Sequence, residues 1–104
     1  MDYRVVITDK AKSQLDDYVR YIAVDLKNPD AARAILGDAE ETKNELSLVA
    51  GSLQVCDNPR LKEYEYRKIL FRRHRYLMLY RLVGSTAVVD AIYHQLQDYE
   101  NIIE

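Results

Sequence analysis

The chain has 104 residues, of which 48% are hydrophobic and 31% are charged, and its formal net charge is −2. This length suits one domain with a single core, and no apolar run approaches the roughly 18 residues that cross a bilayer. Cys56 is the only cysteine, which excludes an internal disulfide. The first residues lead into a strand pattern without a secretory signal, so we expect a cytoplasmic protein with no membrane contact.

The first half of the chain predicts a strand followed by a helical hairpin. Tyr3–Thr8 is short and rich in β-branched residues, which is typical of a strand. Apolar residues then recur at helical spacing from Ala11 to Leu26, and again from Ala32 to Val49. Asn28-Pro29-Asp30 separates the two helices, and Gly51 can end the second one in a left-handed conformation.

The second half predicts a loop and three antiparallel strands. Residues 52–63 are expected to form the loop, because Asp57-Asn58-Pro59 favours a turn. The strands are expected at residues 64–71, 75–83 and 86–94, with Gly84-Ser85 closing the second hairpin. Residues 95–104 can add a short C-terminal helix. The sequence therefore predicts one α+β domain over residues 1–104, ordered β-α-α-β-β-β, whose antiparallel sheet packs against a helical hairpin.

Positive charge is concentrated in residues 60–81, which we call the cationic segment. It holds eight of the fifteen Lys and Arg residues against two acids and is net +6, in a chain that is otherwise acidic. Its cations are Arg60, Lys62, Arg67, Lys68, Arg72, Arg73, Arg75 and Arg81. Tyrosines are interleaved with them, so the segment can offer charge for phosphates and rings for base stacking. The alternative is a solvated sheet face with tyrosines in the core.

Few residues suggest chemistry. There is no glycine-rich phosphate loop, no nucleophile elbow and no paired metal-ligand spacing, so we expect no cofactor and no metal. His74 lies in an expected hairpin turn, where exposure to solvent is the simplest expectation. His94 ends the last strand, where side chains often converge on a cleft, and it can be either an acid–base group or a structural histidine.

The order of elements and three short segments resemble the RelE/ParE superfamily of bacterial toxins. The segments are Tyr66-Arg67-Lys68, residues 76–80 (YLMLY) and residues 92–102 (IYHQLQDYENI). The resemblance implies a growth-inhibiting toxin of a type II toxin-antitoxin system, bound by a partly disordered cognate antitoxin in a heteromeric complex. RelE-like members cleave mRNA in the ribosomal A site. ParE-like members share the fold but poison DNA gyrase without a nuclease site.

The resemblance also implies site residues. In RelE-like nucleases, basic residues on the first strand after the hairpin, an arginine early in the middle strand, and an Arg, His or Tyr at the end of the last strand act on the RNA. Leu77 stands where the middle arginine is expected, and Arg75 or Arg81 can replace it. The expected catalytic set is His94, Arg67, Arg75 and Tyr99. The expected nucleic-acid contacts are Arg60, Lys62, Lys68, Arg72, Arg73, Arg81 and Tyr93.

Three functions follow from this sequence. The first is a ribosome-dependent mRNA endoribonuclease, favoured by His94 and the basic, tyrosine-rich strands. The second is a gyrase poison that acts by binding, favoured by the long helical hairpin and by Leu77. The third is an inactive binding module.

Overall fold

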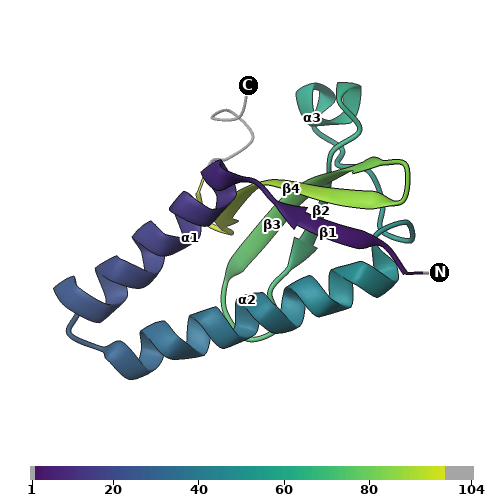
Figure 1. The fold of residues 1–104 in the computed structure, drawn as a ribbon. Helices are drawn as coiled ribbons and strands as arrows, with labels where there is room; N and C mark the ends of the chain where they lie inside the picture. Colours follow the sequence, from purple (N-terminus) through teal and green to yellow (C-terminus); the bar gives the residue numbers. More distant parts are fainter. Residues whose placement is uncertain (1, 98–104) are drawn as a thin grey trace.

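The computed structural model describes residues 2–97. The sheet lies between a long helical hairpin on one side and a short helix on the other (Figure 1). Its elements are β1 (Arg4–Ile7), α1 (Asp9–Arg20), the π-helical segment η1 (Tyr21–Asp25), α2 (Pro29–Val49), α3 (Pro59–Glu63), β2 (Arg67–Leu70), β3 (Tyr76–Val83) and β4 (Thr86–His94). The predicted α+β class is confirmed, with the helical hairpin against the sheet.

Both helices of the hairpin begin at side-chain caps. The Thr8 hydroxyl accepts a hydrogen bond from the Ala11 amide at 3.2 Å, and the Asn28 side chain accepts one from Ala31 at 3.1 Å. Pro29 fills the first turn of α2, where its missing N–H costs nothing. The sequence predicts one helix as far as Leu26. In the structure the α-helix ends at Arg20, and the chain continues as the π-helical turn of η1 to Asp25.

The sheet has the order β1-β4-β3-β2. β2, β3 and β4 are antiparallel neighbours as predicted, and Gly84 turns the chain between β3 and β4 with a φ of 61°. β1 differs from the expected arrangement because it pairs with β4 in parallel. The whole helical hairpin and two strands separate β1 from β4, so no tight turn forces them to be antiparallel.

Both faces of β3 are buried, as the alternating apolar residues predict. Tyr76, Met78 and Tyr80 face the helical hairpin and join its buried residues in one core cluster. Leu77 and Leu79 face the other way and form a second cluster, which α3 covers with Leu61. The face of the sheet that carries this second cluster is called the outer face below.

The short helix α3 lies where the sequence predicts a loop. The Asn58 side chain accepts hydrogen bonds from the amides of Arg60 and Leu61, and Pro59 occupies the first turn. The first strand after the hairpin therefore begins at Arg67 and not at Tyr64. The expected C-terminal helix falls mostly on residues 98–104, which lie outside the described residues.

Gly51 follows the end of α2 but does not adopt a left-handed conformation. Among residues 2–97, positive φ occurs at Lys27, Glu65 and Gly84. A side chain at Gly51 would collide with the ring of Tyr3. The position therefore favours glycine because the Tyr3 hydroxyl approaches the backbone closely.

Candidate functional site

The β2–β3 turn of the cationic segment is fixed to α2 by one buried carboxylate. The side chain of Asp38 is 0% exposed and accepts hydrogen bonds from the backbone amides of Arg72, Arg73 and His74 at 2.9–3.2 Å. It also contacts His74 Nδ1 at 2.7 Å. Burial raises the pKa of Asp38, but these hydrogen bonds outweigh burial, so the pKa is lowered below its ordinary value.

The two arginines of this turn face acids of the same helix. Arg73 makes a two-oxygen contact with the Glu41 carboxylate at 2.7 and 2.8 Å, and Arg72 lies 3.5 Å from Glu45. Hydrogen bonding to Glu41 raises the pKa of Arg73. In this structure, the predicted nucleic-acid contacts Arg72 and Arg73 are thus partly neutralised by α2.

Arg67, a predicted catalytic residue, lies on the helix side of the sheet. Its guanidinium donates to the carbonyl oxygens of Leu53 at 2.5 Å and Gly51 at 3.3 Å. Tyr80 donates its hydroxyl to the Ala50 carbonyl at 2.7 Å beside them. The two carbonyls follow the end of α2 at Val49 and belong to no helix, so the guanidinium supplies a hydrogen-bond donor for them. Arg67 therefore caps the segment that follows α2.

The Arg67→Gln variant is expected to lose stability, because glutamine lacks the charge and the fork that reach these carbonyls. We expect the free energy of unfolding to fall by about 1.5–3 kcal/mol, the range for hydrogen bonds to charged groups. Chemical denaturation measures this directly. Wild-type stability in this variant would show that the guanidinium contacts contribute nothing to the fold.

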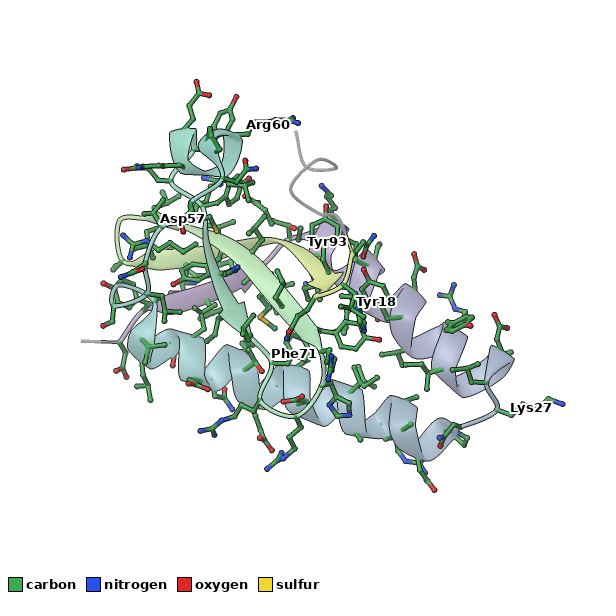
Figure 2. The ribbon with its side chains drawn as sticks, turned by 180° about the vertical axis from the view of Figure 1, so that it is seen from behind. Tyr18, Lys27, Asp57, Arg60, Phe71 and Tyr93 are labelled. Carbon is green, nitrogen blue, oxygen red and sulfur yellow. The ribbon has the colours of Figure 1, made fainter. Side chains whose placement is uncertain are left out.

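His94 is half-buried at the end of β4, on the helix side. Its ring meets the edge of the Tyr76 ring at 5.1 Å, and its Nδ1 accepts a hydrogen bond from the Leu96 amide at 3.1 Å. Tyr18 of α1 and Phe71 also pack against Tyr76, with ring centroids 5.0 and 5.7 Å apart (Figure 2). The imidazole is thus a member of an aromatic cluster.

The other predicted residues differ in their exposure to solvent. Arg75, Lys68, Arg60 and Lys62 are exposed, whereas Tyr93 is only 2% exposed and offers no free ring for stacking. Tyr99 lies outside the described residues. Arg75 lies in the turn before β3, and its carbonyl accepts a hydrogen bond from the Gln95 amide at 2.8 Å, next to His94. Arg67 pairs with Tyr80, towards the other end of β3, so the structure does not bring Arg67 together with Arg75 or His94.

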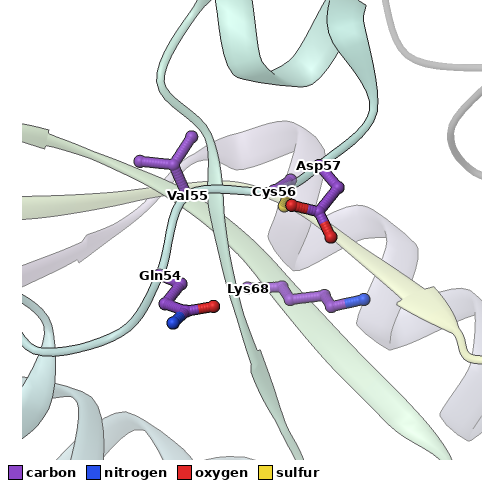
Figure 3. A pocket seen from close by; sticks show the side chains of 5 residues that line it. All are labelled: Gln54, Val55, Cys56, Asp57 and Lys68. Atoms are coloured by element: carbon purple, nitrogen blue, oxygen red, sulfur yellow. The ribbon is translucent and has the colours of Figure 1, made fainter.

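A small cavity lies beside β2, and the exposed Lys68 of this strand is one of its lining residues. It has a volume of about 240 Å³ and is lined by Gln54, Val55, Cys56, Asp57 and Lys68 (Figure 3). In the part of the chain that the structure describes, no three His, Cys, Asp or Glu side chains gather closely enough to hold a metal ion.

Two acids that organise this region were missed in the sequence. Asp38 lies within the buried stripe of α2, between Ile35 and Thr42, and a lone acid on an apolar stripe is a signal that could have revealed it. Asp90 is the extra residue of a β-bulge, since Tyr80 pairs with Val89 but Leu79 pairs with Ala91. No local sequence signal marks that bulge.

A mixed sheet backed by a helical hairpin, with cations along β2 and β3, places the chain in the RelE/ParE class of folds. The sequence matches the family model described as the ParE toxin of the type II toxin-antitoxin system parDE over residues 5–99, so the chain belongs to the ParE toxin family. The resemblance to the RelE/ParE superfamily is thereby confirmed.

A solved structure shares the fold. The structure described as the chromosomal ParDE TA system from P. aeruginosa is similar with a TM-score of 0.72 and 21% identity, covering 88% of this chain and 95% of its own. No curated protein matches the sequence significantly. No helix among the described residues is long and apolar enough to cross a membrane.

Proposed function

We propose that this toxin of a type II toxin-antitoxin system acts by binding DNA gyrase and trapping the enzyme on broken DNA, without cleaving RNA. Membership of the ParE family supports this proposal, because ParE-like toxins poison gyrase. Since gyrase and the chromosome are cytoplasmic, we place the action of the toxin in the cytoplasm.

The observation that carries the proposal is the separation of the predicted nuclease residues. RNA cleavage through the 2′-hydroxyl needs an acid, a base and cations around the same phosphate. Here Arg67 pairs with Tyr80 and donates to the carbonyls after α2, whereas His94 and Arg75 lie towards the other end of β3, beside and just before Tyr76. The mRNA endoribonuclease activity predicted from the sequence stays a prediction, which the assay in the next paragraph also tests.

A two-arm assay with purified toxin separates the two functions. In one arm, gyrase, relaxed plasmid and ATP are incubated with toxin and stopped with detergent and protease, which releases trapped breaks as linear DNA. In the other arm, a reporter mRNA is translated in a cell-free extract with the same toxin. We expect linear DNA to rise with toxin and the mRNA to stay full length. Cut mRNA without DNA breaks would overturn the proposal.

His94→Gln should leave gyrase trapping within about twofold of wild type. Glutamine can still accept the Leu96 amide hydrogen bond, whereas general acid–base catalysis by imidazole typically contributes about 10²–10⁴ in rate. The dose of toxin that gives half-maximal linear DNA measures the effect. A loss of a hundredfold or more in a stably folded variant would contradict the binding mechanism and restore the imidazole as a chemical group.

We further propose that the cognate antitoxin binds through an acidic and apolar C-terminal segment that folds on the toxin. The net charge of the cationic segment favours an acidic partner, and a disordered partner can cover a large surface. Co-purification with the product of a neighbouring gene tests this. The proposal fails if deletion of the C-terminal segment of that product leaves binding unchanged.

A further inference from the structure

Three side chains of the outer face meet at the bulge of β4. The Asp90 Oδ2 atom accepts a hydrogen bond from the Tyr66 hydroxyl at 2.8 Å and another from Arg81 Nε at 2.8 Å. Burial, and then the hydrogen bond to Asp90, raises the pKa of Tyr66 to about 12, so its hydroxyl remains a donor at neutral pH. The bulge therefore supplies a carboxylate that holds Arg81 in a fixed orientation.

Arg81 keeps donors for a second acceptor. A guanidinium has five N–H groups, and the contact with Asp90 through Nε leaves those of the two terminal nitrogens. The Arg81 side chain is 42% exposed. An arginine held along one edge loses little further freedom when it binds a planar or tetrahedral anion, which suits a phosphate.

Lys68 lies on the same face, one strand away. It pairs with Leu79, so it is the diagonal neighbour of Arg81 at a typical separation of about 7–8 Å, within reach of long side chains. Lys68 is exposed, and so is Lys62 on α3, the helix that packs on this face. Asp57 lines a cavity together with Lys68, so an acid also lies at this part of the face.

This face differs from the β2–β3 turn in how its charge is used. Arg73 contacts both oxygens of Glu41 and Arg72 lies beside Glu45, whereas Arg81 contacts Asp90 through Nε. Arg81 can therefore bind a second acceptor through its terminal nitrogens while it keeps its contact with Asp90.

We propose that Arg81 and Lys68 form a phosphodiester contact through which the toxin touches the DNA held by gyrase. This inference rests on the proposed function, because it needs the gyrase–DNA complex as the partner. It adds that the toxin recognises the DNA backbone as well as the enzyme.

The test measures toxin affinity for gyrase alone and for gyrase on a linear duplex, each between 50 and 200 mM salt. Wild type is compared with Arg81→Gln and Lys68→Gln, because Lys68 lies on β2 and not on the bulged strand β4. Arg33→Gln is the matched control, because Arg33 is an exposed arginine on the helical hairpin that pairs with Asp30. Chemical denaturation verifies that each variant is folded.

We expect each outer-face variant to lower the salt slope of binding to the gyrase–DNA complex by about one. Over this fourfold range of salt, a slope change of one corresponds to about a three- to fourfold smaller loss of affinity. Affinity for gyrase alone should stay unchanged, and Arg33→Gln should behave as wild type. Inorganic phosphate at matched ionic strength should compete only weakly, whereas strong competition would identify a site for free phosphate and overturn the DNA contact.

The proposal also fails if both outer-face variants keep the wild-type slope. Failure of the proposed function looks different, because wild-type toxin would then bind gyrase neither alone nor with DNA.

Discussion

Replacing Asp38 with alanine is expected to destabilise the fold by about 3–5 kcal/mol, because three backbone amides lose their acceptor and each unsatisfied group costs roughly 1–3 kcal/mol. The carboxylate is completely buried and holds three backbone amides together with the ring of His74. This loss is a large fraction of the roughly 5–15 kcal/mol that stabilises a typical domain. Chemical denaturation at neutral pH measures it.

The matched control is Glu41→Gln, on the same helix and facing the same turn, whose exposed pair with Arg73 should matter far less. The pH dependence gives a second test. Since the folded pKa of Asp38 is lowered, its contribution is present above its ordinary value of 3.8 and is lost as pH falls through the lowered value. Asp38→Ala should therefore be less sensitive to acid than wild type. Equal stability of Asp38→Ala and Glu41→Gln would show that the β2–β3 turn does not depend on the Asp38 carboxylate.

Replacing Leu61 with alanine should cost about 2–5 kcal/mol, the usual range for truncating a buried leucine. Leu61 is 1% exposed and is the residue by which α3 enters the outer cluster, next to Leu77 and Leu79. The variant should also expose the outer face, which hydrogen exchange of the β3 amides would report. Leu48→Ala is the control, because Leu48 is 63% exposed and should change stability by no more than about 0.5 kcal/mol. A cost below that of the control would mean that α3 does not stabilise the sheet.

The helical hairpin and the β3–β4 hairpin could be predicted because their signals are local. Apolar spacing marks α1 and α2, and Gly84 marks the tight turn. The helix α3 could not be found in this way, since its five residues bury only Leu61 and give no periodic pattern. The parallel pairing of β1 with β4 depends on contacts between distant parts of the chain.

The candidate site was harder to predict for the same reason. A sequence shows that Arg67 is basic, but only the fold places the carbonyls of Gly51 and Leu53 within its reach. Similarly, the sequence suggests that the arginines at 72–73 can bind a polyanion, but in the fold α2 places Glu41 and Glu45 beside them. The local concentration of charge predicted a surface that binds polyanions. The tertiary structure determines which cations of the cationic segment are exposed to solvent and which contact acids of the same chain.

Gyrase poisoning is tested most directly by inducing the toxin in cells that lack the antitoxin and following DNA and mRNA together. We predict that gyrase-linked chromosome breaks and DNA-damage signalling appear first, while translated mRNAs stay intact. Cuts in translated mRNA that precede any DNA break would contradict this account and return the toxin to the RNA-cleaving branch.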